Sequence, residues 1–124
     1  MPLEIKTMEA TLAELAKPIP AKYQKVNSFT NKPFFPVNVY KKALYYRVPQ
    51  HSVQCNSHLS GIYCVTDVTI EIACSDGVLV RSANGFEQLE LEKQMRGDPA
   101  TNSFAQAFKL ACQQFGLGKA EAGE

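Results

Sequence analysis

Residues 98–118, DPATNSFAQAFKLACQQFGLG, carry both a start signal and a stop signal for a helix. Asp98 is a good N-cap, Pro99 stands where a missing N–H costs nothing, and Gly116 suits the left-handed position after the last turn. Between these ends one face is apolar, with Phe104, Ala107, Phe108, Ala111 and Phe115 at three-and-four spacing. The opposite face is polar and nearly uncharged, with Asn102, Gln106, Lys109 and Gln113. The three phenylalanines of the apolar face need other apolar side chains to pack against, and we expect a sheet to provide them.

The segment before this helix alternates as a half-buried strand does. Its even positions, expected to face inward, are Ile62, Cys64, Thr66, Val68, Ile70, Ile72 and Cys74. Ser75-Asp76-Gly77 predicts a turn into a return strand at 78–81, and Asn84-Gly85 predicts a second turn before Phe86, Leu89 and Leu91. Residues 61–92 are therefore predicted to form a three-stranded antiparallel meander. The fold class is α+β, a β-β-β-α core with the long helix packed across one face.

The first half of the chain is predicted to add two helices. Thr7 or Thr11 can cap a short N-terminal helix over roughly residues 8–17, which Pro18 ends. Its expected apolar stripe is Leu12, Leu15 and Ala16. Residues 18–36, with four prolines, are expected to be loop.

The second helix is expected from residue 36 or 37 to about Tyr46, with Val39, Leu44 and one tyrosine inward. An extended edge segment around 47–54 follows it. With 124 residues the chain is long enough for one core, so residues 1–118 are predicted to be a single domain and 119–124 a disordered tail. No apolar run has the length of a membrane span and residues 1–4 do not begin a signal peptide, so we expect a cytoplasmic protein without a membrane partner.

The cysteines and histidines give no firm sign of a metal site or of catalysis. Cysteines 55, 64, 74 and 112 are predicted to be reduced, because nothing indicates export and three of them lie in apolar patterns. Cys55-x-x-His58 has the spacing of half a zinc site, with Cys64 or Cys74 as a further ligand, but no second tight pair follows. His51 and His58 are expected to be surface or satisfied loop histidines. We therefore predict no metal, no other cofactor, no catalytic residue and no enzyme.

Charge is distributed unevenly along the chain. Residues 1–60 hold eight basic and three acidic side chains, a balance of +5, whereas residues 61–124 hold five and nine, a balance of −4. No Asp or Glu occurs in the 52 residues between Glu14 and Asp67. This acid-free segment carries Lys17, Lys22, Lys25, Lys32, Lys41, Lys42 and Arg47, interleaved with Tyr23, Phe29, Phe34, Phe35, Tyr40, Tyr45 and Tyr46.

Cations beside aromatic rings are what a groove for single-stranded nucleic acid uses, because the cations neutralise phosphates and the rings stack on bases. The alternative is a solvated basic surface whose aromatic residues belong to the core. Composition alone leaves both interpretations open, with nucleic-acid binding slightly ahead.

Residues 103–118 resemble the Ala-rich helix, ending in Phe-Gly-x-Gly, of single-strand annealing proteins of the Rad-fifty-two superfamily, especially bacterial DdrA-like members. Upstream, residues 61–65, the Ser75-Asp76-Gly77 turn and Asn84-Gly85-Phe86 resemble the family's hairpin. The first helix followed by Pro18-Ile19-Pro20 resembles its opening, so that the resemblance spans roughly residues 10–118.

The resemblance implies a core that assembles into rings, binds single-stranded DNA along a positively charged groove and anneals complementary strands without ATP. Of the Lys-Arg-x-x-Arg cluster that the family's long helix presents to the DNA backbone, Lys109 alone is retained, and the family's Gly-Trp pair is absent. We expect basic residues of the acid-free segment to compensate, namely Lys32, Lys41, Lys42 and Arg47, with Tyr40 or Tyr45 as stacking partners.

The sequence thus predicts a homo-oligomer that binds and anneals single-stranded DNA in recombination or DNA repair. Binding is expected to be mainly electrostatic, with weak sequence preference and steep salt dependence. A meander leaves edge strands that a ring of subunits can cover. The alternative is a protein-interaction or structural module of the same fold that has lost DNA binding, and RNA or duplex DNA are alternative ligands.

Overall fold

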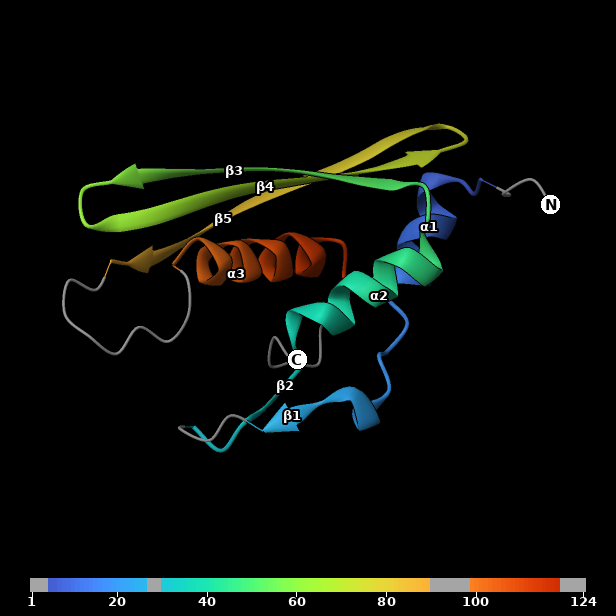
Figure 1. Cartoon of the computed structure of the whole chain (residues 1–124). Helices are drawn as coiled ribbons and strands as arrows, with labels where there is room; N and C mark the ends of the chain where they lie inside the picture. Colours follow the sequence, from blue (N-terminus) through green and yellow to red (C-terminus); the bar gives the residue numbers. More distant parts are fainter. Residues whose placement is uncertain (1–4, 27–29, 90–98, 119–124) are drawn as a thin grey trace.

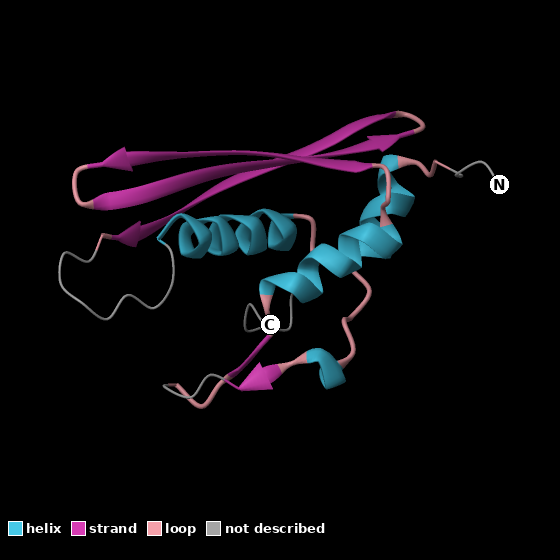
Figure 2. Cartoon of the chain, in the orientation of Figure 1, coloured by secondary structure: helices cyan, strands magenta, loops and turns pink. Residues whose placement is uncertain are grey.

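A three-stranded sheet and three helices make up most of the fold in the computed structural model, which describes residues 5–26, 30–89 and 99–118. The elements in order are α1 (Met8–Leu15), the 3-10 turn η1 (Ala21–Tyr23), β1 (Lys25–Val26), β2 (Pro33–Phe34), α2 (Val37–Arg47), β3 (His51–Ser60), β4 (Tyr63–Cys74), β5 (Gly77–Gln88) and α3 (Pro99–Gln114). Strands β3, β4 and β5 form an antiparallel sheet in that order, and α3 lies across one face of it, with α2 running obliquely beneath (Figure 1). The short β1–β2 ribbon lies on the side of α2 away from this sheet (Figure 2).

The central strand β4 places its even-numbered side chains toward α3 and α2. The buried ones are Cys64, Thr66, Val68, Ile70 and Ile72. Ile62 was predicted to join them, but it lies in the turn before β4 and is exposed. The predicted fold class, α+β with an antiparallel meander, a long helix across one face and a short N-terminal helix, is confirmed.

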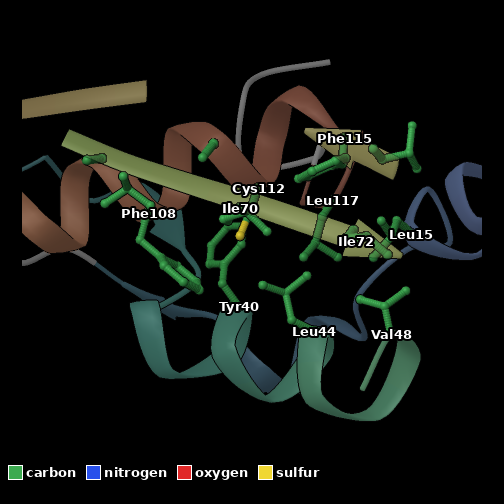
Figure 3. Packing of buried hydrophobic residues seen from close by; sticks show 14 of the residues in the cluster. Leu15, Tyr40, Leu44, Val48, Ile70, Ile72, Phe108, Cys112, Phe115 and Leu117 are labelled. Carbon is green, nitrogen blue, oxygen red and sulfur yellow. The ribbon is translucent and has the colours of Figure 1, made fainter. Parts of the chain in front are cut away.

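The core lies between β4 and the two longer helices. Helix α2 and the residue after it direct Tyr40, Leu44 and Val48 toward Ile70 and Ile72 of β4. Helix α3 bounds the core on its other side (Figure 3). The α3 and C-terminal side chains there are Phe108, Cys112, Phe115 and Leu117. Burying each large apolar side chain contributes about 1.5–3 kcal/mol, so this junction is the main source of apolar stabilisation.

Helix α3 has the face and the end that its sequence predicts. Ala107, Phe108, Ala111 and Phe115 are buried, and Phe104 is half-buried at the margin of the core. Gly116 has a φ of 96°, the left-handed conformation expected after the last turn. The predicted N-cap and the predicted tail at 119–124 lie outside the described residues.

The predicted strand boundaries are wrong at both sides of β4. The first strand of the meander is β3, which pairs with β4 from His51↔Ile72 to Ser60↔Tyr63, whereas only an edge segment around 47–54 was expected. The predicted Asn84-Gly85 turn does not exist, because Asn84 pairs with Asp67 inside β5. A Cβ at Gly85 would lie 2.8 Å from the Ala107 backbone nitrogen, so this glycine permits close approach of α3 rather than a turn.

The N-terminal half agrees with prediction in outline. Thr7 caps α1 by accepting a hydrogen bond from the Ala10 N–H at 3.1 Å. Thr11 and Leu15 form its buried face, whereas Ala16, predicted to be in the stripe, is the exposed C-cap. Helix α2 confirms the second predicted helix, and the loop at 18–36 contains η1 and the β1–β2 ribbon.

Candidate nucleic-acid interface

Helix α2 presents a compact basic and aromatic face to solvent. Because α2 buries Tyr40 and Leu44, the two positions that follow each of these residues point outward. These outward residues, which we call the α2 face, are Lys41, Lys42, Tyr45 and Tyr46. The tyrosine rings meet edge to face at 5.2 Å between centroids, and they are 65% and 77% exposed. Each lysine therefore lies one helical turn from an open tyrosine ring.

A hollow of about 460 Å³ lies on one side of the α2 face; we call it the first hollow. Its lining comes from α2, β3 and α3 and comprises Lys41, Lys42, Tyr45, Tyr46, His51, Val53, Phe104 and Phe108. Lys41 Nζ is 5.2 Å from the centroid of the Phe104 ring, which places the ammonium over the aromatic floor. None of the described lining residues is acidic.

A second hollow, of about 410 Å³, lies on the other side of α2. Ile19, Pro20 and Tyr23 of the preceding loop form its far wall. Lys42 and Tyr46 line both hollows and so form a ridge between them. A polymer that crosses this ridge would pass phosphate-binding and stacking groups in immediate succession.

The structure brings together only some of the predicted DNA-binding residues. Lys41, Lys42 and Tyr45 lie together on the α2 face and line the first hollow. Lys32 is exposed before β2 and is not among the described residues that line either hollow. The remaining three make structural contacts; they are Tyr40, Lys109 and Arg47, of which Arg47 also lines the second hollow.

Arg47 ties the end of α2 to the end of α1. Its Nη1 donates to the carbonyl oxygens of Lys17 at 2.7 Å and of Glu14 and Leu15 at 3.3 Å. Its Nη2 donates to the Pro18 carbonyl oxygen at 3.3 Å. The last carbonyls of a helix need such donors, so this guanidinium serves as a cap for α1.

Tyr40 was predicted to stack on bases, and this prediction is wrong for the folded conformation. Its side chain is 0% exposed, and its ring meets Phe35 edge-on at 6.4 Å between centroids. Its hydroxyl accepts a hydrogen bond from Gln113 Nε2 at 3.2 Å, so both ends of the side chain belong to the core. Lys109 Nζ lies 5.6 Å from this ring and 5.4 Å from the Phe34 ring, which joins α3 to β2.

His51 was not predicted to belong to this site. His51 Nδ1 lies 2.7 Å from the Val48 carbonyl oxygen, which only accepts, so Nδ1 carries the proton and the neutral ring has its lone pair on Nε2. Phe104 was assigned to the apolar face of α3, although it also forms the floor of the first hollow. No local pattern signals either role, because the hollow is formed by three separate elements.

The zinc spacing weighed above does not form a chelating pair. Cys55 and His58 are three residues apart in β3, so their side chains point to opposite faces of the sheet. His58 Nδ1 is instead 4.0 Å from Asp67 Oδ2 on the face away from α3. Among the described residues no group of three or more potential metal ligands occurs.

The described residues contain no helix long and apolar enough to cross a membrane. Compared with known proteins, the chain matches no protein-family model and no curated protein.

Proposed function

We propose that this protein binds single-stranded DNA across the α2 face and anneals complementary strands without ATP, in recombination or DNA repair. The observation that carries the proposal is the pairing of Lys41 and Lys42 with Tyr45 and Tyr46 on one exposed helix face between two hollows. The proposal includes a cytoplasmic location and assigns no catalytic step to the chain.

The chemistry of the α2 face suits a single strand better than a duplex. Ammonium groups release counterions from phosphates whatever the sequence, which gives affinity without base readout. Exposed tyrosine rings stack on bases only where those bases are unpaired, and each stacked base is worth about 1–3 kcal/mol. No described residue that lines either hollow is acidic, so no carboxylate there opposes a phosphate chain.

Self-assembly is the second part of the proposal. The outer strands β3 and β5 have no further strand partner among the described residues. At one end of the sheet Leu59, Ile62 and Phe86 are 68%, 50% and 57% exposed, and Tyr63 meets Phe86 edge-on at 5.6 Å. We call these four residues the apolar tip. Exposed apolar side chains on both faces of this end, beside the unpaired edge of β3, support contact with a second copy of the chain, whereas the β5 edge at Phe86 is covered by Gln106 of α3.

The apolar tip also favours one alternative, a protein-interaction module of the same fold that does not bind DNA. A monomer without affinity for oligonucleotides would identify that module. A large oligomer that binds single strands would support the annealing function.

Fluorescence anisotropy of a labelled single strand at increasing salt tests DNA binding, with a duplex of equal length measured beside it. We expect tighter binding of the single strand and a linear fall of log affinity with log salt. Lys41→Ala and Lys42→Ala should each flatten the slope by about 0.7, the value for one phosphate contact on a single strand. Lys25→Ala removes the same charge from exposed β1, outside both hollows, and should leave the slope unchanged.

No binding at low salt would overturn the proposal. Equal effects of Lys25→Ala and Lys41→Ala would show that binding depends on overall charge and not on the α2 face. Annealing is measured separately, as the rate at which two labelled complementary strands pair in the absence of ATP.

A further inference from the structure

The lining of the first hollow combines apolar side chains with the imidazole of His51, one nitrogen of which already makes a hydrogen bond. Val53, Phe104 and Phe108 give it apolar walls, and Tyr45 stands at its margin. His51 contributes the imidazole, whose Nδ1–H is already donated to the Val48 carbonyl oxygen. In the neutral ring the nitrogen left for a ligand is Nε2, and it can only accept a hydrogen bond.

The lining of the hollow is also cationic. Lys41 and Lys42 line it, and Lys41 Nζ lies over the Phe104 ring at 5.2 Å. A flexible lysine can move to a phosphate, and its departure would uncover the ring for stacking. A suitable ligand is therefore a flat ring with a hydrogen-bond donor at its edge, joined to an anion.

We propose that the first hollow holds one base of the bound single strand and that His51 Nε2 accepts a hydrogen bond from the exocyclic amine of that base. The inference rests on the proposed function and adds a base preference to it. Cytosine presents an N4 amino donor where thymine presents the O4 acceptor, so the His51 lone pair attracts the first and repels the second. The two rings have similar size, which makes them a matched pair of ligands.

Three labelled oligonucleotides of equal length test the proposal at one fixed salt concentration: oligodeoxycytidylate, oligodeoxythymidylate and an abasic backbone. We expect oligodeoxycytidylate to bind about 5- to 150-fold more tightly than the abasic backbone, the range for one stacked base. We expect it to bind about 2- to 10-fold more tightly than oligodeoxythymidylate, the range for one hydrogen bond. All three should share one salt slope, because they carry the same phosphates.

His51→Asn isolates the base contact. The asparagine amide can still donate to the Val48 carbonyl oxygen, but the acceptor at the Nε2 position is lost. The preference for cytosine should disappear, while the affinity for oligodeoxythymidylate stays within about twofold. His58→Asn is the matched control, since His58 lies in the same strand but faces the other side of the sheet, and it should keep the preference.

Tyr45→Ala should lower the affinity for both base-bearing strands while leaving binding of the abasic backbone unchanged. Equal affinity for oligodeoxycytidylate and oligodeoxythymidylate, both above the abasic backbone, would overturn the base-binding inference and leave the proposed function intact. A cytosine preference that survives His51→Asn would overturn the role of His51. Failure of all three oligonucleotides to bind would overturn the proposed function itself.

Discussion

Thr66 of β4 and Ser103 of α3 share a buried hydrogen bond, with 2.6 Å between their hydroxyl oxygens. Ser57 Oγ lies 2.7 Å from Thr66 Oγ1, and Ser103 Oγ lies 3.1 Å from the Ala100 carbonyl oxygen. When Ser103 donates to that carbonyl, Thr66 donates to Ser103 and Ser57 donates to Thr66. A line of hydroxyls therefore runs from the edge strand β3 along the α3-facing side of the sheet to the first turns of α3.

Thr66→Val should break this line without changing the shape of the core. Removal of the buried hydroxyl leaves Ser103 and Ser57 without their shared partner, which we expect to lower the free energy of unfolding by about 1–3 kcal/mol. Urea unfolding measures the effect. Thr69→Val is the control, because its bond to Ser82 at 2.9 Å is exposed, and it should change stability by less than about 0.5 kcal/mol. Equal costs for the two variants would contradict the argument.

Arg47→Lys should separate capping from phosphate binding. Lysine keeps the charge but cannot match the planar fork that reaches the carbonyls of Lys17 and Pro18, so we expect a loss of about 1–3 kcal/mol in unfolding free energy. Arg47 lines the second hollow, but its guanidinium donates to four backbone carbonyls, so the salt slope for a single strand should stay at the wild-type value in both Arg47→Lys and Arg47→Ala. A flatter slope in Arg47→Ala alone would instead place Arg47 on the DNA.

Cysteine labelling should distinguish the surface of β3 from the core. Cys55 is exposed and Cys112 is fully buried, and burial raises the pKa of the Cys112 thiol well above its ordinary value. The thiolate is the reactive form, so Cys55 should be alkylated quickly near neutral pH and Cys112 only after unfolding. Mass spectrometry after timed alkylation, with and without urea, gives both rates. Rapid alkylation of Cys112 in native protein would contradict the described packing.

Phe86→Ser should weaken self-association through the apolar tip. The side chain is largely exposed, so its loss should cost the folded subunit little, while removing apolar area from a contact between copies. Light scattering during size-exclusion chromatography measures the change in mass. Val78→Ser is the control, because Val78 is also exposed on β5 but lies at the other end of that strand. An unchanged mass for Phe86→Ser would exclude the tip as the interface.

Prediction from sequence succeeded where one element carries its own pattern. The alternation along β4 and the glycine that ends α3 are local signals, and both agree with the structure. Strand β3 was only partly predicted, because an edge strand that is exposed on most of its length shows little apolar alternation. Asn84-Gly85 has the chemistry of a turn, yet the approach of α3 decides its conformation.

The candidate site was predictable to a similar extent. Lys41, Lys42 and Tyr45 came from the basic and aromatic composition of one segment, and they lie together because they share a helix. The structural roles of Arg47 and Tyr40 depend on the end of α1 and on α3, which are distant in sequence. Likewise, His51 joins the site only because β3 and α2 flank the same hollow.

The anchoring of α1 has a consequence for the order in which the chain folds. The Met8 N–H donates to Asp76 Oδ1 at 2.8 Å across a separation of 68 residues, and the Ser75 N–H donates to the Lys6 carbonyl oxygen at 2.9 Å. The β4–β5 hairpin closes a much shorter loop and supplies the turn to which α1 binds, so loop-closure entropy favours its earlier formation. We therefore expect α1 to dock late, so that substitutions in it change the unfolding rate more than the folding rate.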